Sequence, residues 1–205
     1  MQRMLEIKSF IFGPFQTNTY VVDAGQGNIL LVDPACAAES ERRRLKEKIP
    51  DASHVTILAT HGHLDHLWGA AWACQQWGGP VWIHPDDIPM AQAMQQQYDL
   101  FGVHAKAEPF PMKSLNEATE ILYGAAPQIL HTPGHTPGSV CFYWPEHKTL
   151  LSGDTLFCRG YGRTDLPGGN WMQLIQSLKL LFELPGDTLV LCGHGENTTI
   201  IAEKQ

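Results

Sequence analysis

The first third of the chain shows the short-period hydrophobic pattern of β-strands. Residues 5–12 alternate between apolar and polar positions, residues 19–22 are β-branched or aromatic, and residues 28–32 form a short apolar run. Gly13-Pro14 and the segment 25–27, which contains two glycines, supply turns between them. Three closely spaced strands joined by tight turns predict an antiparallel meander.

The rest of the chain alternates between helical and strand patterns. A charged helix is expected over residues 40–49, where Pro50 ends it. Longer helices are predicted over 65–77, 85–98 and 170–184, and residues 99–115 are expected to be irregular. Further strands are predicted over 55–59, 80–83, 128–130, 139–144, 149–151 and 188–191. This alternation predicts a layered α/β protein, and since no linker or repeat interrupts it, we expect one domain over residues 1–205.

Composition narrows the class of protein further. The 205 residues are 43% hydrophobic and 17% charged, which excludes a disordered or fibrous chain. A net charge of −7 argues against a nucleic-acid partner, and no apolar run approaches the roughly 18 residues of a membrane span. The five cysteines form no CxxC pair, so we expect reduced thiols and a cytoplasmic location. The unusual feature is the number of histidines, which is ten.

Four candidate metal ligands stand together directly after the strand predicted at 55–59. The segment reads His61-Gly62-His63-Leu64-Asp65-His66. His61 and His63 can point together from an extended loop, whereas Asp65 and His66 stand where the next helix begins. Asp65 alone would be read as a helix N-cap and one histidine as a structural residue. The four together predict a metal site.

Three further candidates occupy equivalent places elsewhere in the chain. His135, Asp154 and His194 each follow a predicted strand and a turn of small residues. Strand ends gathered at one edge of a sheet sandwich can converge on one point. Nitrogen and carboxylate ligands without thiolate suit zinc, iron or manganese. Seven ligands exceed one tetrahedral site, so two divalent ions that share a bridging carboxylate fit the set better.

These motifs together resemble the metallo-β-lactamase-fold hydrolases over almost the whole chain. The resemblance rests on Asn18-Thr19-Tyr20, Asp33, the HxHxDH segment, residues 131–139, Ser152-Gly153-Asp154-Thr155 and Gly193-His194-Gly195. It implies a four-layer αββα sandwich with the site at one edge. It also implies the ligand roles: one metal is held by His61, His63 and His135, the second by Asp65, His66 and His194, and Asp154 bridges them.

The segment 161–169 is similar to a loop of short glyoxalase II-like hydrolases, which implies cleavage of a small-molecule thioester. We expect a metal-bridging hydroxide as nucleophile and Asp65 as the catalytic residue that orients it. Tyr161 and Arg163 are the candidate substrate contacts, although Arg163 can equally pair with Asp165. Full hydroxyacylglutathione hydrolases carry an additional C-terminal helical region, so a glutathione substrate is not predicted. The bridging Asp154 argues against β-lactam hydrolysis.

Two alternative reactions keep the same fold. His61, His135 and Asp154 form a two-histidine, one-carboxylate set, which is the ligand type of mononuclear iron oxygenases. The chain resembles the persulfide dioxygenases of the superfamily in this set and in a GRTD-containing loop, which implies a mononuclear iron persulfide dioxygenase as one alternative. A lactonase or another ester hydrolase is the second. Outside the ligand set, Asp33 is expected to orient a ligand by hydrogen bonding. His131 is expected either to support a ligand or to be structural, and ordinary surface or core positions are expected for His54, His84, His104 and His147.

Overall fold

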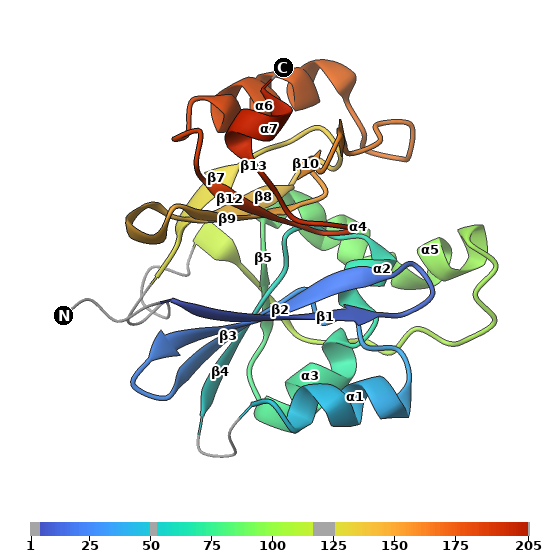
Figure 1. The fold of residues 1–205 in the computed structure, drawn as a ribbon. Coiled ribbons are helices and arrows are strands. Elements are labelled where there is room, and N and C mark those ends of the chain that lie inside the picture. The colour runs from blue at the N-terminus through green and yellow to red at the C-terminus, as the bar shows by residue number, and fades with distance from the viewer. Residues whose placement is uncertain (1–4, 50–52, 117–125, 205) are drawn as a thin grey trace.

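The predicted antiparallel meander begins the first sheet of the protein, seen here in a computed structural model that describes residues 5–49, 53–116 and 126–204 (Figure 1). The meander pairs neighbouring strands in chain order, and three further strands continue the sheet in parallel. The six strands, in their spatial order, are β1 (Glu6–Phe12), β2 (Thr17–Gly25), β3 (Asn28–Val32), β4 (His54–Leu58), β5 (Val81–Ile83) and β6 (Met112–Ser114).

The second half of the chain forms another mixed sheet, in the order β13-β12-β9-β8-β7. β7 and β9 are both antiparallel to β8, and β12 is parallel to β9, so β7, β9 and β12 run in the same direction. The strands are β7 (Gln128–His131), β8 (Val140–Trp144), β9 (Thr149–Gly153), β12 (Leu189–Cys192) and β13 (Thr198–Thr199). A separate hairpin joins β10 (Leu156–Phe157) to β11 (Gly160–Tyr161).

Helices cover the outer faces of both sheets and give the predicted αββα order (Figure 1). The first sheet is covered by α1 (Glu39–Lys46) and α3 (Ala70–Trp77), and the second by α6 (Trp171–Phe182) and α7 (Ile200–Glu203). The remaining helices are α2 (Leu64–Leu67), η1 (Pro85–Asp87), α4 (Ile88–Gln92), α5 (Met94–Leu100) and η3 (Pro145–His147). None of the helices in the described ranges is both long and apolar enough to traverse a bilayer.

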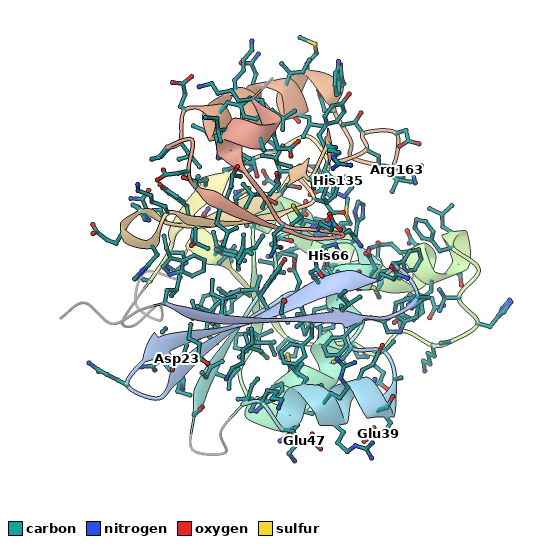
Figure 2. The ribbon with its side chains drawn as sticks, in the orientation of Figure 1. Asp23, Glu39, Glu47, His66, His135 and Arg163 are labelled. Atoms are coloured by element: carbon teal, nitrogen blue, oxygen red, sulfur yellow. The ribbon has the colours of Figure 1, made fainter. Side chains whose placement is uncertain are left out.

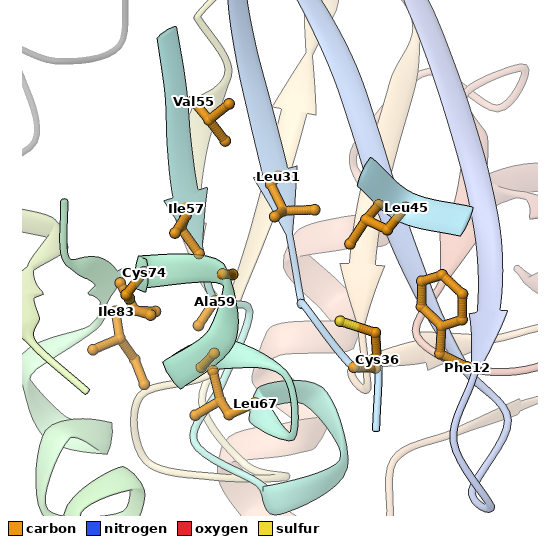
Figure 3. Packing of buried hydrophobic residues seen from close by; sticks show 14 of the residues in the cluster. Phe12, Leu31, Cys36, Leu45, Val55, Ile57, Ala59, Leu67, Cys74 and Ile83 are labelled. Carbon is orange, nitrogen blue, oxygen red and sulfur yellow. The ribbon is translucent and has the colours of Figure 1, made fainter. Parts of the chain in front are cut away.

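Neighbouring residues along the central strands point to opposite faces of the sheet and therefore lie in different hydrophobic cores. Val21 and Leu31 pack toward α1 and α3, in the cluster of Figure 3, whereas Leu30 of the same sheet packs between the two sheets. In the second sheet Phe142 points to the same inter-sheet core and Tyr143 points toward α6. Because both faces of these strands are buried, their sequences are continuously apolar rather than alternating.

Three of the element predictions need correction. The helix predicted over 65–77 is two helices, α2 and α3, separated at Gly69, where a side chain would collide with the Sγ atom of Cys36. The helix predicted over 85–98 is the succession η1, α4 and α5. The stretch 99–115, expected to be irregular, contains β6, which pairs in parallel with β5.

Candidate metal centre

The candidate ligands meet at one edge of the sandwich because several strands end there. Thr60 and His61 follow β4, Asp154 follows β9 and His194 follows β12. Backbone hydrogen bonds join the two sheets at this edge, from Val140 N to Thr60 O at 2.8 Å and from Asn18 N to Gly193 O at 2.7 Å. Figure 2 shows His66 and His135 one above the other at this edge of the sandwich.

One group of possible ligands consists of His61, His63 and His135, whose ring nitrogens lie within 4.8 Å of one another. All three side chains are buried. His63 Nδ1 lies 2.9 Å from His135 Nε2. Three buried imidazole nitrogens that face a common point form a donor set suited to a divalent metal ion.

A second group consists of Asp65, His66 and His194, again within 4.8 Å. His194 Nε2 lies 3.2 Å from Asp65 Oδ2 and 3.3 Å from His66 Nε2. The Thr17 hydroxyl donates a hydrogen bond of 2.9 Å to Asp65 Oδ2 and so fixes that carboxylate. This group offers two nitrogens and one oxygen.

Asp154 lies between the two groups. Its Oδ1 is 3.2 Å from His66 Nε2, while its Oδ2 is 3.5 Å from both His135 Nε2 and His194 Nε2. A carboxylate that contacts members of both groups is placed as a bridging ligand would be. Only glycine fits at position 193 beside it, because a side chain there would collide with Asp154 Oδ1.

Hydrogen bonds to the outer ring nitrogens orient the histidines. The Nδ1 atoms of His66, His135 and His194 donate to Asp33 Oδ2, Arg163 O and Phe15 O at 2.8, 2.7 and 3.0 Å. Each of these bonds leaves Nε2 facing the centre, as in metal-ligating histidines generally.

His61 is held in the same way by a relay through Thr60. The Thr60 hydroxyl donates to Asp33 Oδ2 at 2.7 Å and can therefore accept from His61 Nδ1 at 3.0 Å. His61 Nε2 is buried and makes no hydrogen bond to any residue that the structure describes. A lone pair that is buried and unpaired is suited to a metal ion.

The electrostatics of the centre also suit cations. Burial lowers the pKa of His61 far below its usual value and that of His63 to about 3. Both rings are therefore neutral at pH 7, and each has a nitrogen lone pair that can bind a metal ion. Burial acts in the same direction on His66, but Asp154, Asp65 and Asp33 outweigh it and raise the pKa of His66. These three carboxylates therefore favour a positive charge on the side of the centre where His66 lies. The residues fit a pair of divalent ions.

Asp33 gives a test of this orientation. Its backbone has φ +53°, which asparagine tolerates better than alanine does, so Asp33→Asn is the cleaner variant. The amide would turn one acceptor into a donor facing Thr60 or His66. We expect metal affinity to fall roughly 10–100-fold in a competitive zinc titration. Asp187→Asn, an exposed carboxylate paired with Lys148, should leave affinity unchanged. Equal affinities in both variants would contradict this role of Asp33.

One supporting residue, Asp87, was not identified from the sequence. Its buried carboxylate accepts hydrogen bonds from Gly62 N, Thr136 Oγ1 and Gly138 N at 2.8, 2.7 and 2.6 Å. Burial raises the pKa of Asp87, and these three bonds oppose the shift. The residue thus ties the loop of His61 and His63 to the loop of His135.

The predicted substrate contacts lie on the exposed surface. The Arg163 guanidinium forms two hydrogen bonds with the Asp165 carboxylate, at 2.7 and 2.6 Å, so the pairing alternative is the one present. Its backbone carbonyl, by contrast, holds His135. The Tyr161 ring packs against Trp171, with ring centroids 5.2 Å apart.

His84 and His131, for which no ligand partners were expected, lie together with Asp86 in a third group within 4.8 Å. Their rings are stacked nearly parallel, 4.2 Å apart. His84 Nδ1 accepts from the Asp86 amide at 3.3 Å, and His131 Nε2 donates to Pro137 O at 2.9 Å. Since parallel rings do not direct their nitrogens at one point, we assign this group a structural role.

The family model for the metallo-beta-lactamase superfamily matches residues 12–194. The chain belongs to the metallo-β-lactamase superfamily. Hydroxyacylglutathione hydrolase GloC of Haemophilus influenzae is a superfamily relative that is 36% identical, over 93% of this chain and 91% of its own. The probable metallo-hydrolase YqgX of Bacillus subtilis is 34% identical, over 94% and 91%.

Solved structures of this superfamily agree with the fold. A di-iron-bound form of TTHA1623 has a TM-score of 0.85 at 36% identity and covers 97% of both chains. BLEG-1, described as a B3 metallo-beta-lactamase, has a TM-score of 0.83 at 33% identity and covers 97% of this chain and 96% of its own.

Proposed function

We propose that this protein is a dinuclear metal-dependent hydrolase that cleaves small-molecule thioesters. The observation that carries the proposal is the pair of ligand groups with Asp154 between them. His61, His63 and His135 would hold one ion, Asp65, His66 and His194 the other. We propose zinc as the ion, with iron as the alternative to test because the similar TTHA1623 structure is di-iron-bound.

The bound ions would supply Lewis-acid chemistry, which polarises a carbonyl group and lowers the pKa of water from about 16 toward 7. Asp65 is the residue suited to orient the attacking water. Burial alone would raise the pKa of Asp65, but the neighbouring His66 and His194 lower it to about 2, so the carboxylate is ionised and accepts hydrogen bonds. The Thr17 hydroxyl holds that carboxylate in place.

Thioesters suit this centre because a thiolate is a weakly basic leaving group that departs without a strong general acid. The name of the GloC relative supports the same substrate class. A small-molecule substrate rather than a nucleic acid is proposed because the net charge is −7. The five unpaired cysteines accord with a cytoplasmic protein.

A mononuclear iron persulfide dioxygenase is the second candidate. Its supporting observation is a two-histidine, one-carboxylate group of His61, His66 and Asp154, and His135 of the predicted set lies 3.5 Å from Asp154. The hydrolase is preferred because both ligand groups are complete.

Metal analysis combined with four assays tests the choice. Protein purified without added metal is expected to contain two metal ions per chain and to cleave an acetyl thioester. The comparison substrates are a lactone, a persulfide with oxygen uptake and, because of the similarity to BLEG-1, a β-lactam. One iron per chain with oxygen uptake would establish the dioxygenase instead. Cleavage of the lactone or the β-lactam without the thioester would overturn the substrate class.

A further inference from the structure

We propose that a groove beside the metal centre binds an unbranched apolar arm of the substrate, which makes the preferred thioester apolar on one side. The inference rests on the proposed function and deepens it. The apolar groove runs between α4, α5 and the loop before α6. Its apolar lining includes Met90, Ala93, Leu100, Phe101, Leu166 and Pro167.

The apolar groove is continuous with the metal centre. Its inner part, a pocket of about 60 Å³, is lined by His63 together with Leu100 and Phe101. Its outer part, of about 560 Å³, shares Met90, Leu100 and other lining residues with the inner part. A chain that enters along the outer part therefore reaches a histidine of the first ligand group. The outer volume is in the range of small-molecule sites.

The groove offers no counter-charge to an anionic arm. Of the described residues that line its two parts, none is Lys or Arg, and the one charged side chain is Asp86. The nearby Arg163 is already paired with Asp165. An arm that carries carboxylates would lose hydration here without gaining an ion pair, and Asp86 would repel it.

Two glutamines line the groove: Gln96 lies on its exposed outer part, and Gln97 belongs to both parts and is bound to the backbone. Gln97 Oε1 accepts from Leu64 N at 2.9 Å, and its Nε2 donates to Gly62 O and Met90 O at 3.0 and 2.9 Å. Gln97 therefore anchors the metal-site loop to α4 and has no N–H donor left for a ligand. The uncharged surface that remains for recognition is mostly apolar.

Exposed apolar side chains mark the rim of the groove. Leu100 is 63% exposed and Phe101 is 39% exposed. Phe101 packs edge-on against Phe15, with centroids 5.7 Å apart, and the carbonyl of Phe15 holds His194. The rim therefore lies near both ligand groups, because Phe101 lines the pocket with His63 and also packs against Phe15. Large exposed apolar groups that adjoin a polar centre are typical of ligand-binding surfaces.

A chain-length series of thioesters tests the groove. One set varies the acyl group from acetyl to decanoyl on N-acetylcysteamine, and the other varies the S-alkyl group on an acetyl ester. We expect kcat/KM to rise about fourfold per added methylene in one set, which identifies the arm that enters the groove. Leu100→Ala should flatten that slope. Leu180→Ala, an exposed leucine on α6, is the matched control and should retain it.

Binding separates this inference from the proposed reaction. Calorimetry with straight-chain carboxylates from butanoate to decanoate should show affinity that increases with length in the wild type and in Leu180→Ala, but less in Leu100→Ala. If affinity increases with length in this way but no thioester is cleaved, the groove binds an apolar arm and the proposed thioesterase activity is wrong. Acetyl thioester cleavage with no length dependence in either kinetics or binding would overturn the groove and leave the reaction standing.

Discussion

Replacing Asp154 with asparagine is expected to release both metal ions together and to lower kcat/KM by on the order of a thousandfold or more. The carboxylate contacts His66 and His194 in one ligand group and His135 in the other, so its loss affects both. An asparagine offers one neutral oxygen where two anionic oxygens are needed to bridge. Metal content by mass spectrometry should therefore fall from about two ions toward none, rather than from two to one.

Thermal stability gives a second measurement, independent of turnover. An ion that binds the folded state stabilises it by mass action, so added zinc should raise the melting temperature of the wild type. The Asp154→Asn variant should show no such rise. Asp165→Asn is the control, because this exposed carboxylate pairs with Arg163 and with none of the proposed ligands. Full zinc occupancy in Asp154→Asn would show that Asp154 is not a shared ligand.

The residues of the candidate metal centre could be predicted from the sequence because the signals for them are local. Each candidate ligand follows an apolar strand, and strands that run in the same direction end at the same edge of a sheet. The pattern therefore predicted that the ends of β4, β9 and β12 would meet. The meander was equally readable, because tight turns separate strands that pair with their neighbours in the chain; β3 has the predicted bounds.

Features that depend on contacts between distant residues were not readable. The apolar periodicity is unbroken through Gly69, yet the helix ends there because the backbone packs against Cys36. β6 is three residues long, Met-Lys-Ser, and exists through its pairing with β5 rather than through local preference. Asp87 bonds to residues 25 to 51 positions away, and the segment Pro85-Asp86-Asp87 predicts no more than the start of a helix.

Asp87 leads to the largest expected effect on stability. Removing its carboxylate in Asp87→Ala leaves the amides of Gly62 and Gly138 buried without an acceptor, while the Thr136 hydroxyl keeps Ser139 Oγ as a partner. Each unsatisfied buried donor costs about 1–3 kcal/mol, so the loss of the acceptor for these two amides should lower the free energy of unfolding by roughly 2–6 kcal/mol. That is a large part of the ~5–15 kcal/mol that stabilises most domains. Urea denaturation of the metal-free protein measures it without a contribution from bound ions.

Asp87→Asn and Asp86→Asn make the test specific. The asparagine keeps one oxygen and turns the other acceptor into a donor, so one of the three partners faces an N–H group. Its cost should be about 1–3 kcal/mol, between those of the wild type and Asp87→Ala. Asp86 is the neighbouring carboxylate on the surface, and its replacement should change stability by less than about 0.5 kcal/mol. Because Gly62 separates His61 from His63, the same order should appear in zinc affinity. If Asp87→Ala has the same stability and zinc affinity as Asp86→Asn, the Asp87 carboxylate does not hold the two histidine loops together.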